Sequence, residues 1–536
     1  MRKRTLLLPL MALALASLAG CSAEKDPLDD DPIKLQKDSS TDYEYADSSN
    51  AEGSANYEIF VRSFYDSNGD GIGDLNGVKA KLPYLADMGY KSLWLMPIFP
   101  SGSYHGYDVL DYFNVNSDYG TLDDFDSLVS EAKKYNIEIV LDMVLNHCSL
   151  QNPYFTESFA DYKAGKTGED SKADWFNFGD TGDHVYQGVH YESRFDANMP
   201  DFNLDSEGVR AEMEKIVKFW IGHGVKGFRL DAVLYYYYQN VDQNVAFLNW
   251  LSEIAKKYDP DFHMVGECWI SDLSLDSYYV SACDSFFDFS VASGGDSSCI
   301  NFIKGYGRVS NLSEFIEKHE NYRKKKNPSS YSSYFLNNHD QDRIAKNFTD
   351  TNLYKSACTF YTLLPGDVYT YYGEEIALKG TRKTNPDDQN DVRRRLPMVW
   401  SERNKTGECS FPDPSAPELN NNDQVSKGAE DQLKESFSLT NHYKMMIHLR
   451  NKYSWIKHAT YKNLCDDLHS SEFSVMAYSL TYGEQKIIVV HNFASYNVEV
   501  SVPATEILEQ INIMHRVPEL SEGTLRLAAH SSVILK

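Results

Sequence analysis

Apolar residues follow two alternating patterns along the chain from residue 57 onward. Short, nearly continuous apolar runs are typical of buried strands, and an apolar residue at every third or fourth position is typical of helices. Residues 121–135 show the helical pattern, with Leu122, Phe125 and Leu128 on one face. The strand-like runs lie at residues 57–61, 92–96, 138–144, 227–231, 263–267, 284–289, 333–338 and 368–373.

Eight strand–helix units are the number that closes an α/β barrel of the (β/α)8 TIM type. An open, doubly wound sheet also alternates strands with helices, so the pattern alone leaves it as the alternative. We predict the barrel because the number of runs matches it.

Two regions interrupt or follow this alternation. Residues 148–205 hold many Gly, Asp, Tyr and Asn residues between the third run and the next helical stretch. A connection of this length is typical of an inserted subdomain or a lid, so we predict a loop-rich subdomain after strand 3. Residues 453–536 resemble antiparallel strands joined by turns, which predicts a C-terminal β-sandwich domain. The barrel is then expected to comprise residues 56–147 and 206–452.

The first residues carry a targeting pattern. A basic start, MRKR, precedes an apolar run over residues 5–20 and the sequence LAGC, which ends at Cys21. This pattern resembles the bacterial lipoprotein cleavage box, and it predicts a signal peptide over residues 1–21 with a lipid on Cys21. A plain signal peptide or a membrane anchor is the alternative. Residues 22–55 are acidic and polar, and we interpret them as a tether that holds the protein outside the cytoplasm at the bacterial cell envelope.

Composition narrows the choice of partners. The chain has 536 residues, of which 42% are hydrophobic, so it is long enough for two or three domains. Its formal net charge of -26 would repel nucleic acid phosphates, which excludes nucleic acid as a partner. The 37 tyrosines suit the faces of sugar rings, although most aromatic residues in any protein belong to its core. We expect the protein to act as a monomer.

Three carboxylates fall where a barrel places its chemistry, at the carboxyl ends of strands. Asp231 and Glu267 end the fourth and fifth runs, and Asp340 follows the seventh. Each acid alone can be a capping or ion-pairing residue. Three acids that converge on one end of a barrel indicate catalysis instead.

The neighbours of these acids suggest different roles. Arg229 alternates with Asp231 along one strand face, so its guanidinium should keep Asp231 ionised and lower its pKa, as a nucleophile requires. Glu267 lies in the more apolar segment GECW, which should raise its pKa, as a general acid requires. Two such carboxylates about 5 Å apart predict retaining hydrolysis of a glycosidic bond through a covalent glycosyl–enzyme intermediate. Asp340 would then hold the hydroxyls of the distorted ring.

Four segments, in order, resemble the signatures of the α-amylase family, glycoside hydrolase family thirteen. The resemblance covers about residues 56–400. It implies that Asp231 is the nucleophile, Glu267 the acid/base and Asp340 the stabiliser of the transition state. It also implies that His147, Arg229 and His339 bind the reacting sugar and that Tyr107 lies beneath its ring. The four segments are DMVLNH (142–147), GFRLDA (227–232), GECW (266–269) and FLNNHD (335–340).

Further residues place the chain within that family. The segment MPDFN (199–203) resembles the MPDLN signature of a subgroup intermediate between oligo-1,6-glucosidases and neopullulanases. Members of this subgroup act largely as α-amylases. Exo-acting relatives carry an acidic residue three positions before the tyrosine beneath the ring, where this chain has Tyr104. The resemblance therefore predicts an endo-acting enzyme that cleaves α-1,4 bonds of starch and maltooligosaccharides by double displacement.

Other functions remain open at this point. An exo-acting α-glucosidase, an oligo-1,6-glucosidase and a glucan transferase share the same signatures, because water and sugar compete for one intermediate. A non-catalytic, surface-located sugar-binding protein is a further alternative from another class. Loss of one of the three acids would have indicated that alternative, and all three are present.

The loop at residues 66–74 suggests a metal ion. Gly71 occupies the sharp-turn position of this loop. The loop is similar to the calcium loop of the oligo-1,6-glucosidase branch, and a turn without metal is the alternative. The usual second calcium of α-amylases is doubtful, because AVLY (232–235) replaces Ala-Val-Lys-His and removes a histidine ligand. The oxygens expected to bind Ca²⁺ belong to Asp66, Asn68, Asp70, the Ile72 carbonyl and Asp74.

Overall fold

The computed structural model describes residues 54–292, 298–382, 391–411, 425, 427–468 and 473–536. The predicted signal peptide, Cys21 and nearly all of the predicted tether lie outside these residues. Within the described part of the chain, no helix is both long and apolar enough to cross a membrane.

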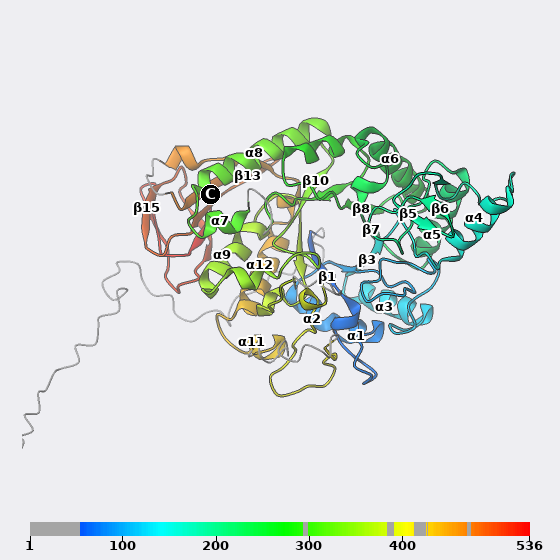
Figure 1. Ribbon diagram of the computed structural model, residues 1–536. Helices are drawn as coiled ribbons and strands as arrows, with labels where there is room; N and C mark the ends of the chain where they lie inside the picture. The colour runs from blue at the N-terminus through cyan, green and yellow to red at the C-terminus, as the bar shows by residue number, and fades with distance from the viewer. Residues whose placement is uncertain (1–53, 293–297, 383–390, 412–424, 426, 469–472) are drawn as a thin grey trace, which may run out of the picture.

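A closed barrel of eight parallel strands forms the centre of the molecule (Figure 1). Each predicted strand-like run overlaps one of its strands, which confirms the barrel and rules out the open sheet. The strands are buried along nearly their whole length, and this explains their continuous apolar character. In order around the barrel they are β1 (Ala55–Ile59), β11 (Asp367–Tyr371), β10 (Tyr331–Phe335), β9 (Ser285–Phe287), β8 (His263–Gly266), β7 (Gly227–Leu230), β3 (Glu138–Met143) and β2 (Ser92–Leu95).

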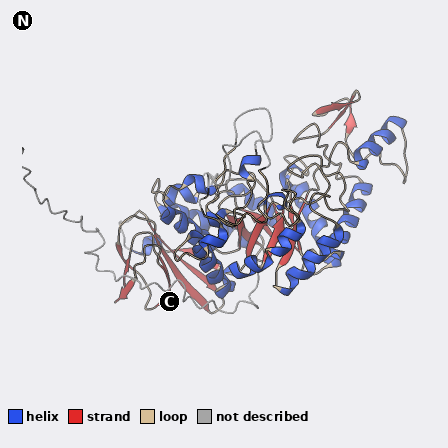
Figure 2. Cartoon of the chain, turned by 90° about the horizontal axis from the view of Figure 1, so that it is seen from below, coloured by secondary structure: helices blue, strands red, loops and turns tan. Residues whose placement is uncertain are grey.

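Helices surround the barrel strands (Figure 2). Helix α3 illustrates how the sequence sets their ends. Thr121 and Asp124 form a capping box at its start, while Phe125 and Leu128 are buried on its inner face. Apart from α4, which lies in the insertion, the described helices are α1 (Leu75–Ala80), α2 (Leu82–Met88), α3 (Leu122–Lys134), α5 (Glu207–Gly222), α6 (Val241–Tyr258), α7 (Cys299–Ile303), α8 (Val309–Lys326), α9 (Thr351–Thr362), α11 (Ala429–Gln432) and α12 (Leu439–Lys452).

The long connection after β3 carries its own small structure. It contains α4 (Pro153–Ala164) and a three-stranded sheet in the order β4-β6-β5. Phe155 of α4 packs against Phe176 and Tyr191 at ring-centroid distances of 5.1 and 5.4 Å, which joins the helix to the sheet. The strands are β4 (Phe178–Gly179), β5 (His184–Tyr186) and β6 (Val189–Tyr191).

Two antiparallel sheets end the chain, at the opposite end of the molecule from this insertion (Figure 1). Val490, Val500 and Leu525 come from both sheets and share one apolar cluster, so the sheets pack face to face. One sheet has the order β12 (Thr460–Asn463), β13 (Val475–Tyr482), β14 (Gln485–Asn492), β19 (Ser532–Leu535) and β16 (Ile507–Ile511). The other has the order β15 (Val498–Ser501), β18 (Thr524–Leu527) and β17 (Glu519–Ser521).

Candidate active site

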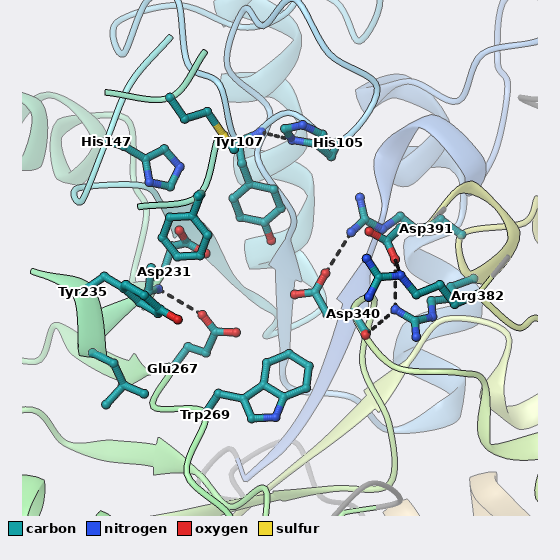
Figure 3. Close-up of a pocket in the computed structure, with 16 residues that line it drawn as sticks. His105, Tyr107, His147, Asp231, Tyr235, Glu267, Trp269, Asp340, Arg382 and Asp391 are labelled. Carbon is teal, nitrogen blue, oxygen red and sulfur yellow. Dashed lines mark hydrogen bonds and ion pairs between the residues drawn. The ribbon is translucent and has the colours of Figure 1, made fainter. Parts of the chain in front are cut away.

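A pocket of about 570 Å³ opens at the carboxyl ends of the barrel strands. Asp231, Glu267 and Asp340 line it together, as Figure 3 shows, and they follow β7, β8 and β10. The predicted sugar contacts Tyr107 and His147 also line it. The barrel thus brings together side chains that are more than a hundred residues apart in the sequence.

Arg229 and His339 are predicted site residues that do not line the pocket. Both are fully buried, and they contact the residues that do line it. Nη1 of Arg229 is 2.6 Å from Oδ1 of Asp231 and 2.8 Å from Oδ1 of Asp142, and Nη2 is 3.1 Å from Oε1 of Glu267. One guanidinium therefore pairs with three carboxylates at neighbouring strand ends.

The pKa of Asp231 differs from the sequence prediction. Burial raises it to about 6, and the adjacent Asp142 carboxylate adds to the rise, while Arg229 opposes it. The predicted lowering is wrong because the sequence did not reveal how deeply Asp231 is buried or that Asp142 and Glu267 share the arginine. Above pH 6 Asp231 is still mainly ionised, so it can act as a nucleophile at neutral pH.

Glu267 has the raised pKa expected of a general acid. Burial is the main cause, Arg229 opposes it, and the charges of Asp231 and Asp340 add to it. Its Oε2 accepts a hydrogen bond from the backbone N–H of Ala232 at 3.0 Å, which fixes the carboxyl group beside Asp231.

Asp340 lies in the opposite electrostatic environment. Burial alone would raise its pKa, but the His339 ring and the guanidinium groups of Arg395 and Arg229 hold the pKa well below its ordinary value. Nη2 of Arg395 is 2.9 Å from Oδ1 of Asp340, and Nε2 of His339 is 3.0 Å from Oδ2. Asp340 is therefore a permanently ionised acceptor in the pocket.

Two further residues are suited to contact a sugar. The hydroxyl of Tyr107 donates to Oδ2 of Asp142 at 3.0 Å and lies 2.7 Å from Nε2 of His339, so the ring is held firmly from below. His147 has a pKa lowered to about 3, mainly by burial, and its ring is neutral. Its Nε2 has no partner among the described residues, which leaves this nitrogen for a bound hydroxyl.

Sequence reasoning missed several residues of this site. Asp142 is paired in register with Arg229 across β3 and β7, and the first signature contains it, so knowledge of strand pairing would have found it. Trp269 lies within the third signature and lines the pocket, with its side chain 48% exposed. Arg395 and Glu58 lie far from the other site residues in the sequence, and no local pattern marks them.

The predicted calcium loop is an ordered turn before α1. The carboxylate of Asp66 accepts hydrogen bonds from the amides of Gly69 and Gly71 at 2.6 and 2.7 Å, and Asp74 caps α1 through Gly77. Its donors are all oxygen, the type that calcium prefers. However, no group of three or more His, Cys, Asp or Glu residues in the described ranges is placed to hold a metal ion. Calcium in this loop stays a prediction.

Comparison with known proteins agrees with this geometry. Residues 58–459 match the family described as alpha amylase, catalytic domain, and residues 475–534 match the Alpha-amylase SusG C-terminal domain. Alpha-amylase 3 of Dictyoglomus thermophilum is 34% identical over 498 residues, which cover 90% of this chain and 92% of that protein. Oligo-1,6-glucosidase of Parageobacillus thermoglucosidasius is 28% identical over 82% of this chain and 89% of its own length. The solved structure of Eubacterium rectale Amy13B has a TM-score of 0.83 and 33% identity, and the match covers 91% of this chain and 97% of that one.

Replacement of Arg229 by alanine should destabilise the protein strongly. Three buried carboxylates would lose their shared cation, and loss of one partner from a buried ion pair typically costs about 3–5 kcal/mol of unfolding free energy. Chemical denaturation measures this loss. The control is Arg526→Ala, which breaks an exposed pair with Glu499 and should leave the unfolding free energy close to that of the unaltered protein. Equal effects of the two substitutions would contradict the bridging role of Arg229.

Proposed function

This chain belongs to the α-amylase family and is a glycoside hydrolase, and we propose that it is a retaining, endo-acting hydrolase of α-1,4-linked glucans. The observation that carries the proposal is the pairing of Asp231 and Glu267 with one guanidinium. A shared cation keeps two carboxyl groups close together, as the spacing of about 5 Å in a retaining pair requires.

In the first step, a carboxylate oxygen of Asp231 attacks the anomeric carbon of the sugar. The bond between that carbon and the glycosidic oxygen breaks, and Glu267 gives its proton to the departing oxygen. The raised pKa of Glu267 keeps this proton in place, and Asp231 is ionised because the pH lies above its own pKa.

In the second step, Glu267 removes a proton from water, and the resulting hydroxide attacks the anomeric carbon and releases Asp231. Both transition states resemble an oxocarbenium ion. The ionised Asp340 accepts hydrogen bonds from ring hydroxyls, and the unpartnered Nε2 of His147 can bind another hydroxyl. Tyr107 supports the ring from a position fixed by Asp142 and His339.

The environment of Tyr104 favours cleavage inside a chain. Tyr104 stands where exo-acting relatives carry the acid that binds a chain end. Its ring packs against Phe60 at 5.1 Å, and its hydroxyl donates to the Arg395 carbonyl at 3.3 Å, so it does not line the pocket. The similarity to an oligo-1,6-glucosidase keeps an exo-acting α-glucosidase as the second candidate.

We further propose that the enzyme works outside the cytoplasm, held to the cell envelope by a lipid on Cys21. This part of the proposal rests on the sequence of residues 1–21. An extracytoplasmic enzyme would meet starch and maltooligosaccharides before their uptake.

The last part of the proposal is a calcium ion bound by the loop before α1. Asp66, Asn68, Asp70, Asp74 and the Ile72 carbonyl would hold it. An ionised carboxylate has about four acceptor positions, so the hydrogen bonds that Asp66 accepts from backbone amides leave room for a cation. The ion would fix the loop and the start of α1, and it would take no part in the chemistry.

The early products from amylose test the endo-acting assignment. The enzyme without residues 1–21 should release a spread of maltooligosaccharides in the first minutes. Glucose alone would indicate an exo-acting enzyme, and products longer than a defined donor oligosaccharide would indicate a transferase. Asp231→Asn is the matched control, because it should release nothing while it still binds amylose. Retained hydrolysis by this variant would overturn the nucleophile assignment.

The pH dependence of kcat/KM should show an acid limb near pH 6. Asp231 must be ionised to attack, and activity is lost as pH falls through its raised pKa. Asp142→Asn should move this limb to lower pH, because it removes a like charge and leaves Arg229 more available to Asp231. An acid limb that does not move in this variant would show that a group other than Asp231 sets it.

Calcium should stabilise the chelator-treated protein. Because calcium would bind the folded state and not the unfolded state, Tm should rise with the logarithm of the calcium concentration once that concentration exceeds Kd. Differential scanning fluorimetry can measure the shift. Asp70→Ala should remove most of it, since Asp70 is exposed and its hydrogen bonds to Asn68 and Ile72 stay within the loop. The same Tm with and without calcium would favour the turn without metal.

A further inference from the structure

His339 lies beneath the pocket, between two carboxylates that come from different strands of the barrel. Its Nδ1 is 2.5 Å from Oε1 of Glu58, which belongs to β1, and its Nε2 is 3.0 Å from Oδ2 of Asp340. Glu58 is 1% exposed and does not line the pocket. A buried carboxylate at this position needs a reason, because its burial is costly unless a partner compensates for it.

The hydrogen bonds around His339 define where its protons lie. A phenol has one hydrogen to donate, and Tyr107 donates it to Oδ2 of Asp142 at 3.0 Å. The Tyr107 oxygen must therefore accept from Nε2 of His339, which lies 2.7 Å away. Nδ1 faces the carboxylate of Glu58, and because an ionised carboxylate can only accept hydrogen bonds, Nδ1 is the donor. Both ring nitrogens consequently carry a hydrogen, and His339 is an imidazolium.

We propose that Glu58 is a positioning residue that keeps His339 doubly protonated, so that the imidazolium holds Asp340 and Tyr107 in the orientation that catalysis uses. This inference rests on the proposed function for its catalytic consequence. Glu58 would act only through His339, since it is separated from the pocket by that ring.

The acidic groups near the ring favour its charged form. Burial lowers the affinity of the ring for its second proton, but Asp340 and Glu58 outweigh it and raise the pKa of His339 to about 9. The Asp142 carboxylate also interacts with the ring across the Tyr107 hydroxyl. Two cations also lie close by: Arg395 directs its Nε to the backbone oxygen of His339 at 3.3 Å, and Nη1 of Arg229 lies 3.5 Å from the Tyr107 hydroxyl.

The sign of the pH effect follows from this pKa. The charged ring is present at neutral pH and is lost as pH rises through about 9. Glu58→Gln keeps an oxygen that accepts from Nδ1 but removes the negative charge. An opposite charge at this distance typically shifts a pKa by about one to three units. The pKa of the His339 ring should therefore fall by about one unit or more, which an NMR titration of the ring measures directly, and the alkaline limb of kcat follows this shift where Glu267 still holds its proton.

Activity on maltoheptaose across pH tests the proposal with two comparisons. Glu375→Gln is the matched control, because Glu375 is equally buried and hydrogen-bonded by Tyr57 and Tyr84 but lies away from His339. It should leave the alkaline limb in place. In a His339→Gln background, Glu58→Gln should cause no further loss of kcat, because its effect passes through the ring. A His339 pKa that NMR finds unchanged in the Glu58 variant, or a full additional loss of kcat without the histidine, would overturn the proposal.

A second measurement does not depend on activity or on the folding of the Glu58 variant. Proton-coupled NMR of ¹⁵N-histidine-labelled protein, with His339→Gln to assign the signal, reports both ring nitrogens. Two protonated nitrogens at neutral pH are expected, and a ring with one proton would overturn the inference. If no α-glucan is hydrolysed by the unaltered enzyme, the proposed function fails, while this measurement still decides the state of His339.

Discussion

The buried guanidinium of Arg229 is the constraint on which the site depends. A cation without exposed surface must be compensated, and Asp142, Asp231 and Glu267 do so from the ends of three strands. Those strands, β3, β7 and β8, are neighbours in the barrel. The closure of the sheet therefore positions the carboxyl groups of Asp231 and Glu267, and no loop has to become ordered to bring them together.

A second charged cluster lies beside the first and is joined to it through one hydroxyl. Tyr107 donates to Asp142, which pairs with Arg229, and lies against His339, which pairs with Asp340 and Glu58. Across both clusters, acidic groups outnumber the cations Arg229, His339 and Arg395. The charges of Asp231 and Asp340 add to the rise in the pKa of Glu267. In the proposed mechanism the same excess of negative charge would stabilise a sugar that becomes positively charged in the transition state of each step.

The barrel could be predicted, and the three acids of the pocket could be found, because both leave local marks in the sequence. Each strand falls within a short, largely apolar run; Asp231 and Glu267 end two of those runs, and Asp340 comes shortly after a third. What could not be predicted depends on burial and on distant contacts. The pKa of Asp231 was misjudged because the number of acids that share Arg229 is a property of strand pairing. Glu58 and Arg395 contact the same His339–Asp340 pair from β1 and from the segment near residue 395, and only the folded chain brings them together.

The junction between barrel and insertion shows how one departure from the family pattern is accommodated. The amide of Asn146 donates to Oδ1 of Asp201 at 2.9 Å, and the backbone of Phe202 bonds to the Asn146 carbonyl at 2.9 Å. These bonds join the first signature directly to the segment MPDFN, and His147 forms a backbone bridge within the same contact. Tyr235, which replaces the family's metal-binding histidine, packs on Phe195 at 4.5 Å and becomes part of the pocket wall. These contacts hold His147 at the wall of the pocket, where the proposed function places the reacting sugar.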